Sequence, residues 1–237
     1  MSIYIFEGIV GCGKTGAITY FLYGDRGEKK TYANYHLKFP YTHLEGLGKF
    51  SEWDKEPCNI AIDEAHSAGM DSRNAMSSIN RFYSQNMTQS RKIQSDIYLS
   101  AQDWGMVDVR VRQITAIVFH PSIVAWDANG KPMVIRLDYT TRPFMLDRFS
   151  GYRKRFENTR YISLWDEKEN IHILDMYDTS EIIEEMDDPK QAERLKVFKD
   201  YAHCTDMTKT GLSAKLVMEA GQSKSDADVI AQYIINQ

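Results

Sequence analysis

A glycine-rich turn near the start of the chain constrains the fold more than any other feature. It spans residues 8–15, reads Gly-Ile-Val-Gly-Cys-Gly-Lys-Thr, and follows the apolar run Ile3–Phe6. Behind it, Lys14–Tyr23 has a helical pattern that ends at Gly24. This order of strand, turn and helix fits the pattern G-x-x-x-x-G-K-T, whose backbone N–H groups curl around phosphate oxygens. The sequence therefore predicts a phosphate-binding loop.

The loop and the first turn of the following helix supply the expected nucleotide contacts. Lys14 is expected to reach the β- and γ-phosphates of ATP, and Thr15 to ligate Mg²⁺. The positive N-terminal end of the helix adds to the attraction for phosphate. The residues expected to bind the nucleotide are Gly8, Gly11, Cys12, Gly13, Lys14, Thr15 and Gly16. The alternative is a strand–helix turn with an exposed lysine, which the surrounding pattern disfavours.

A second motif, Asn-Ile-Ala-Ile-Asp-Glu-Ala-His at residues 59–66, supplies two carboxylates after a hydrophobic strand. Asp63, where this strand ends, is expected beside the Mg²⁺. Glu64 stands where an ATPase needs a base to orient and polarise the attacking water. The alternative is that the pair simply caps the next helix. Together with the upstream loop, the motif favours catalysis.

Further polar residues flank the next predicted strand, Ser95–Ser100. Gln102 follows it and is interpreted as a sensor of the γ-phosphate, or alternatively as a satisfied amide at a strand end. Arg91 precedes the strand and is favoured as a finger reaching the γ-phosphate of a neighbouring subunit. Arg112, in the connector Val107–Arg112, is expected to make a structural or a second nucleotide contact. For each arginine alone, a surface salt bridge is an equal or better alternative.

Strands that alternate with helical patterns predict an α/β fold with a mainly parallel central sheet, a RecA-like P-loop NTPase core. The remaining predicted elements of this core are a strand at Lys30–Leu37, a helix at Ser72–Thr88, a strand at Ile114–Phe119, a hairpin at residues 123–139 with its turn at 127–130, and strands at Tyr161–Trp165 and Ile171–Leu174. Asn-Gly between two β-like runs is the signal for the hairpin.

The end of the chain has a different character. A soft boundary near residues 187–189 divides an ATPase domain, 1–187, from a C-terminal helical appendage, 188–237. Predicted helices in the appendage cover Pro189–Ala202, Ser213–Ala220 and Ser225–Ile235.

Composition restricts where such a protein works. The net charge is −4, so any nucleic-acid contact has to come from local basic patches. No apolar run approaches the roughly 20 residues that span a bilayer, and no secretory signal begins the chain. Three cysteines, an odd number, argue against a disulfide framework. A soluble protein in a reducing, cytoplasmic compartment is expected.

The order of motifs resembles the FtsK/HerA superfamily of DNA-pumping ATPases. In particular, it is similar to the zonula occludens toxin-like proteins of filamentous phages and to genome-packaging ATPases of membrane-containing and archaeal viruses. The matching segments cover about residues 1–182 and are Gly8–Thr15, Ile60–His66, the arginine at Arg91, Ser100–Gln102, Val107–Arg112 and Tyr177–Glu181. The filamentous-phage relatives carry a membrane span that is not found here, which favours a soluble packaging motor.

The resemblance implies an ATP-driven translocase of double-stranded DNA, in the host cytoplasm if the protein is viral. Its implied partners are identical subunits in a pentameric or hexameric ring and a capsid or virion membrane protein. The stretch Arg148–Phe156 interleaves cations with aromatics and is a candidate DNA contact, or else a solvated surface segment. Two alternatives remain: a DEAH-type helicase, although only one nucleotide loop is visible, and a nucleotide-gated protein of virion assembly or secretion.

Overall fold

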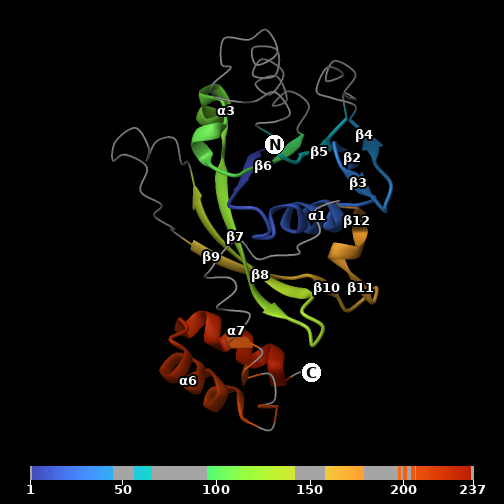
Figure 1. Cartoon of the computed structure of the whole chain (residues 1–237). Helices are drawn as coiled ribbons and strands as arrows, with labels where there is room; N and C mark the ends of the chain where they lie inside the picture. The colour runs from blue at the N-terminus through green and yellow to red at the C-terminus, as the bar shows by residue number, and fades with distance from the viewer. Residues whose placement is uncertain are drawn as a thin grey trace.

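The structure is a computed structural model (Figure 1). It describes residues 2–44, 56–65, 95–141, 158–178, 197–198, 200–201, 204–205 and 207–235. Four sequence predictions lie wholly or mostly outside these residues: the helices Ser72–Thr88 and Pro189–Ala202, the basic stretch Arg148–Phe156 and the boundary near residues 187–189. Arg91 also lies outside them.

Within the described residues, a central sheet of eight strands has the order β4-β2-β5-β6-β1-β7-β8-β9. Neighbouring strands from β4 to β7 pair in parallel, whereas β7, β8 and β9 pair antiparallel. The strands are β1 (Ile3–Glu7), β2 (Lys30–Ala33), β4 (Thr42–His43), β5 (Cys58–Ile62), β6 (Asp96–Ala101), β7 (Ile117–Trp126), β8 (Pro132–Thr141) and β9 (Asn158–Ser163). The predicted α/β fold with a mainly parallel sheet is confirmed.

Helices cover both faces of this sheet. Side chains alternate between the faces along each strand. Phe6 of β1 and Phe119 of β7 therefore pack in one hydrophobic cluster with α1 (Lys14–Gly24). Ile5 and Val118, one position away, belong to a second cluster that includes α3 (Val109–Ile114). All five residues of β5 are buried, as expected for a strand covered on both sides.

Two segments differ from the sequence prediction. The predicted strand Lys30–Leu37 divides into β2 and β3 (His36–Leu37), because the chain leaves the sheet at Asn34. The side chain of Asn34 hydrogen-bonds to the backbone of Asp63, at the end of β5. The predicted connector Val107–Arg112 is largely the short helix α3. Asp108 caps that helix by accepting a hydrogen bond from the backbone N–H of Arg110 at 2.8 Å.

The segment after β9 folds back toward the start of the sheet. Its elements are β10 (Trp165–Asp166), β11 (Ile171–His172), the 3₁₀ turn Ile173–Met176 and β12 (Tyr177–Asp178). The predicted strand Ile171–Leu174 is thus a two-residue strand that continues into the 3₁₀ turn. Strand β12 pairs with β3, which fixes Tyr177 near the N-terminal half of the chain.

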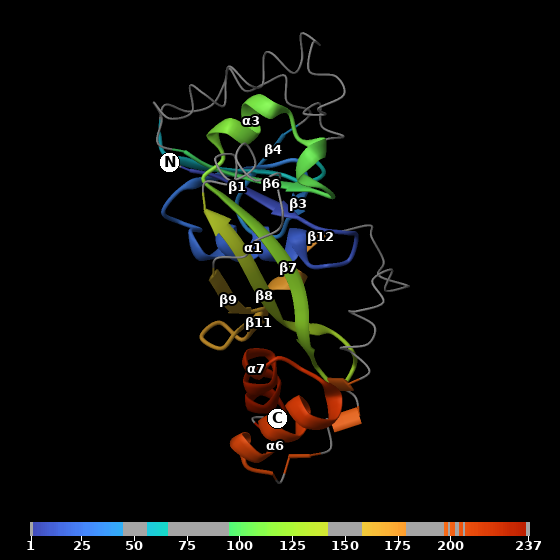
Figure 2. The same ribbon diagram turned by 90° about the vertical axis from the view of Figure 1, so that its left-hand side faces the viewer.

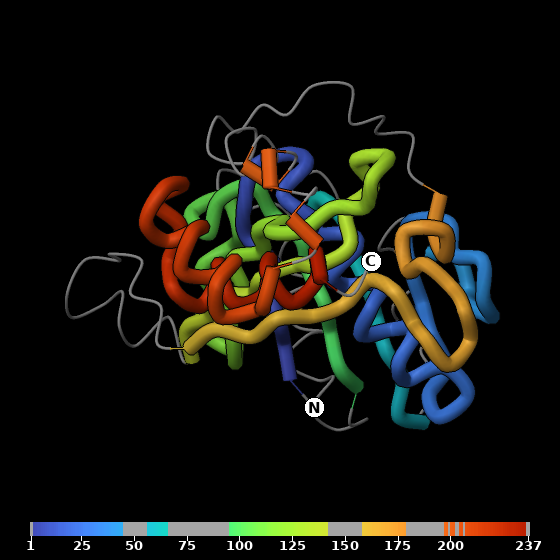
Figure 3. The backbone as a smooth tube through the Cα atoms, turned by 90° about the horizontal axis from the view of Figure 1, so that it is seen from below, coloured from blue at the N-terminus to red at the C-terminus, as the bar shows by residue number. Residues whose placement is uncertain are grey.

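The predicted hairpin is formed by the long strands β7 and β8 (Figure 2). Asp127 orders its turn, since one carboxylate oxygen accepts the backbone N–H groups of Asn129 at 2.9 Å and Lys131 at 2.7 Å. The helices α6 (Lys209–Ala220) and α7 (Lys224–Ile235) lie against the end of this hairpin (Figures 1 and 3). Among the described helices, none combines the length and apolar character that crossing a bilayer requires.

A buried charge network joins α7 to the sheet. Arg136 of β8 donates to Asp226 of α7 at 2.6 Å and also pairs with Asp138 at 2.8 Å. The hydroxyl of Tyr161 on β9 donates to the other oxygen of Asp226 at 3.0 Å. Burial alone would lower the pKa of Arg136, but the two carboxylates override this effect and raise it. Asp226 is only 3% exposed, so it depends on these partners.

We expect Asp226→Ala to lower the free energy of unfolding by about 3 kcal/mol, because it leaves a largely buried guanidinium with one carboxylate fewer. Urea titration followed by circular dichroism measures the change. Glu219→Ala on α6 is the control: Glu219 is exposed, and its removal should cost within about 0.5 kcal/mol. Equal stabilities of the two variants would contradict a structural role for the network.

Candidate functional site

The predicted phosphate-binding loop connects β1 to α1 and lies at the carboxyl end of the parallel strands. This edge is where open α/β sheets bind ligands. The loop backbone requires glycine at Gly13, which has φ of 98° and caps α1 without a side chain. A Cβ atom there would lie 3.0 Å from Cδ1 of Ile135. The loop is therefore held against the hairpin, with the first N–H groups of α1 available to an anion.

Lys14 is buried and its ammonium group lies on the inside of the loop. Its Nζ atom donates to the carbonyl oxygens of Gly8 at 2.8 Å and Ile9 at 2.9 Å. Both acceptors are neutral, and no described carboxylate forms an ion pair with Lys14. The positive charge is thus positioned by the loop without being neutralised, which suits a phosphate ligand.

Thr15 and Asp63 are brought together from α1 and the end of β5. The Thr15 hydroxyl donates to Oδ2 of Asp63 at 2.9 Å, and the hydroxyl of Ser100 on β6 donates to Oδ1. A hydroxyl and a carboxylate are the hard oxygen ligands that Mg²⁺ prefers. Thr15 and Asp63 thus have the chemistry of the predicted metal site, and their role as its ligands stays a prediction.

Asn34, which the sequence analysis missed, hydrogen-bonds through its side-chain amide to the backbone of Asp63. Its amide nitrogen donates to the Asp63 carbonyl at 2.9 Å, and its amide oxygen accepts the Asp63 N–H at 2.7 Å. Ser100 lies in the motif Ser100–Gln102, whose pattern predicts no role for it. No local pattern marks Asn34, because its contact spans 29 positions and depends on β2 pairing with β5.

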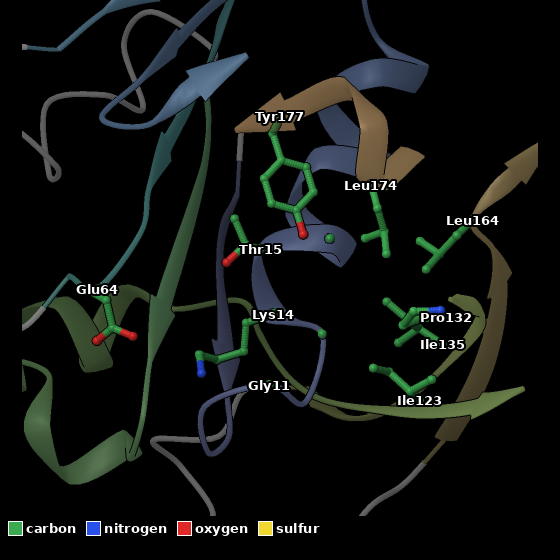
Figure 4. A pocket seen from close by; sticks show the side chains of 12 residues that line it. Gly11, Lys14, Thr15, Glu64, Ile123, Pro132, Ile135, Leu164, Leu174 and Tyr177 are labelled. Carbon is green, nitrogen blue, oxygen red and sulfur yellow. The ribbon is translucent and has the colours of Figure 1, made fainter. Parts of the chain in front are cut away.

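Glu64 lines the same pocket as Lys14 and Thr15. Its backbone has φ of 50°, a left-handed conformation that residues other than glycine rarely adopt. Its N–H donates to the hydroxyl of Ser100 at 2.8 Å, which fixes this turn after β5. Figure 4 shows the Glu64 carboxylate on one side of the phosphate loop. Such backbone strain is often found at functional sites.

The other side of the pocket is apolar and was not predicted. Its walls come from the hairpin, from the residue after β9 and from the segment that ends in β12 (Figure 4). The residues are Ile123, Pro132, Ile135, Leu164, Leu174 and Tyr177. From the sequence alone, these residues look like ordinary members of the hydrophobic core. They belong to separate elements that only the tertiary fold brings together around the pocket.

Three further residues of the predicted site, all described by the structure, lie outside the pocket walls: Gln102, Arg112 and Cys12. Gln102 follows β6 and is exposed, although the loop is anchored next to it by the bond from Gly8 N–H to the Ala101 carbonyl, at 3.1 Å. The guanidinium of Arg112 lies over the ring of Trp104, with its carbon 5.8 Å from the ring centroid. Cys12 is buried with its sulfur against Gly8, where a Cβ atom would come within 2.6 Å.

Together, the strand order, the glycine loop and the paired carboxylates define the fold of a P-loop NTPase. No protein-family profile and no curated protein sequence matches the chain. Among solved structures, the chain is similar to the N-terminal domain of zonular occludens toxin from Neisseria meningitidis, with 19% identity and a TM-score of 0.48, over 75% of this chain and 98% of that one.

A second similar structure is the genome packaging NTPase B204 from Sulfolobus turreted icosahedral virus 2 in complex with AMP. It has 10% identity and a TM-score of 0.43, over 72% of this chain and 94% of that one. Both kinds of protein that the motif resemblance indicated are therefore among the similar structures. At such identities a function does not transfer with the fold, and the chemistry has to follow from this chain's own residues.

Proposed function

We propose that this chain is an ATPase that hydrolyses Mg²⁺-bound ATP at the phosphate loop. The observation that carries the proposal is the convergence of Lys14, Thr15, Asp63 and Glu64 at one edge of the sheet. Each has a distinct task in phosphoryl transfer, a reaction whose catalysis is mostly positioning and charge stabilisation.

The proposed mechanism assigns these tasks by position. Lys14 and the N–H groups of the loop bind the phosphate chain and stabilise negative charge that develops on it. Thr15 and Asp63 would hold Mg²⁺, which supplies further charge neutralisation when bound. The Glu64 carboxylate orients the attacking water and accepts its proton. Asn34 fixes the backbone of Asp63, and Ser100 bonds to both the Asp63 carboxylate and the Glu64 N–H, so the end of the strand is held in place.

We further propose that the hydrolysis drives double-stranded DNA through a homo-oligomeric ring. Supporting this is the motif order that resembles DNA-pumping ATPases. The composition of the pocket also supports it: Lys14 is the one cationic residue among its described walls. Phosphoryl transfer commonly uses a second cation, an arginine supplied by a neighbour. Arg91 is the candidate for that role, and a capsid or virion membrane protein is the proposed docking partner.

The test is the rate of ATP hydrolysis per subunit as a function of protein concentration, with and without double-stranded DNA. If a neighbour completes the site, the rate per subunit should rise steeply with concentration, and DNA should stimulate it. A rate per subunit that changes neither with protein concentration nor with added DNA would contradict the proposed ring translocase. It would not contradict the proposed ATPase activity. Absence of turnover at every concentration would favour a nucleotide-gated assembly protein instead.

A further inference from the structure

The pocket at the phosphate loop has two chemically different halves. Lys14, Thr15 and Glu64 lie in one half, and the apolar wall defined above forms the other (Figure 4). The first turn of α1 lies against this wall: a Cβ atom on Gly16 would be 2.9 Å from Cδ2 of Leu174 and 3.5 Å from the hydroxyl of Tyr177. A ligand whose phosphates bind the loop thus has the apolar wall beside its other end.

We propose that the nucleobase lies against this apolar wall and that the site binds ATP and GTP with similar affinity. The proposal rests on the proposed nucleotide hydrolysis and adds the base specificity of the same site. The predicted lack of base specificity depends on whether the polar groups of the wall are already hydrogen-bonded within the protein. A pocket distinguishes bases strongly only where buried donors and acceptors read the base edge.

Several backbone groups along the wall are hydrogen-bonded or strand-paired within the protein. Ile123 and Ile135 face each other in the β7–β8 ladder. Leu164 donates its N–H to the Met133 carbonyl at 2.8 Å, and its own carbonyl accepts from the N–H of Ile173 at 2.7 Å. These contacts hold the wall in place, and the Leu164 N–H and carbonyl are used within the protein rather than by a ligand.

The side chain of His172 hydrogen-bonds to two more backbone groups of the wall. Its Nδ1 atom accepts the N–H of Leu174 at 3.1 Å, which places the ring hydrogen on Nε2, and Nε2 donates to the Pro132 carbonyl at 2.8 Å. Burial lowers the pKa of His172, and the ammonium of Lys131 lowers it further, so the neutral ring suits both contacts. Pro132 itself has no N–H group. The wall therefore offers a base mainly van der Waals contact.

Tyr177 contributes the polar side-chain atom of this wall. Its ring is positioned by an edge-on contact with Tyr35, at 6.1 Å between centroids. A phenol can either donate or accept a hydrogen bond. It can serve the amino group of adenine and the carbonyl group of guanine equally well. Even a direct contact from Tyr177 thus gives no basis for rejecting one purine.

The experiment compares equilibrium binding of ATPγS, GTPγS and inorganic tripolyphosphate, all with Mg²⁺, to the full chain. We expect the affinities for ATPγS and GTPγS to agree within about tenfold, because apolar contacts alone discriminate weakly. Tripolyphosphate has no base and measures the phosphate contacts alone. A preference above about 100-fold for either nucleotide would overturn the inference but leave the proposed ATPase intact. Failure of all three ligands to bind would overturn both proposals.

A variant locates the base. Leu174→Ala should weaken ATPγS and GTPγS by about tenfold each, the range for an apolar contact, and leave tripolyphosphate unchanged. Asp175→Ala is the matched control, since the neighbouring Asp175 is exposed and pairs with Lys131 at 2.7 Å outside the pocket walls. Unchanged nucleotide binding by Leu174→Ala, or an equal loss for tripolyphosphate, would place the base elsewhere. Thermal unfolding of the variant checks its folding independently of ligand binding.

Discussion

Glu64→Gln is expected to reduce multiple-turnover ATP hydrolysis by about 10²- to 10⁴-fold, the usual contribution of a positioned general base. The amide has nearly the same shape as the carboxylate but cannot accept the proton of the attacking water. The left-handed backbone at this residue and the bond from its N–H to Ser100 do not involve the carboxylate. The variant should therefore retain the fold and the pocket, and bind ATP as the natural chain does.

Phosphate release measures turnover, and displacement of a fluorescent ATP analogue measures binding. Glu167→Gln is the matched control, because Glu167 is exposed and lies outside the walls of the nucleotide pocket. Hydrolysis by Glu64→Gln within twofold of the natural rate would show that another group is the base. Loss of both binding and turnover would instead show that Glu64 holds the loop together.

The parts of the site that the sequence could predict are those with local spacing. The segment Gly8–Thr15 is contiguous, and Asp63 and Glu64 end a recognisable buried strand, so each motif carries its own context. The helix α3 was missed although Asp108 is a typical N-cap residue, because only two apolar positions follow it before Ile114. Its six residues are too few for periodicity to be informative.

The supporting contacts of the site could not be predicted, because they join residues far apart in the chain. Asn34 reaches Asp63 only once β2 and β5 are paired. The apolar wall forms only after β12 returns to pair with β3 and brings Tyr177 to the start of α1. The sequence contains these side chains, but their function depends on strand pairing that local patterns do not specify.

Lys14→Ala should lower kcat/KM for ATP by about 10²- to 10³-fold, the range for removing one preorganised donor to developing negative charge. Lys14 is only 6% exposed, and its two partners are carbonyl oxygens of the loop itself. The structure thus orders this cation at the phosphate site, and the loss should appear in nucleotide binding as well as in turnover. Tripolyphosphate affinity should fall with ATP affinity, because Lys14 contacts the phosphates and not the base.

Lys38→Ala is the control for this change, since Lys38 is an exposed lysine whose backbone N–H bonds to the Met176 carbonyl at 2.8 Å, a bond that the substitution preserves. Thermal unfolding of both variants separates a binding defect from a folding defect. We expect Lys14→Ala to unfold cooperatively, because its partners lie on a surface loop where water can replace the ammonium. Undiminished tripolyphosphate binding by a folded Lys14→Ala variant would contradict a phosphate role for this lysine and, with it, the proposed orientation of the nucleotide.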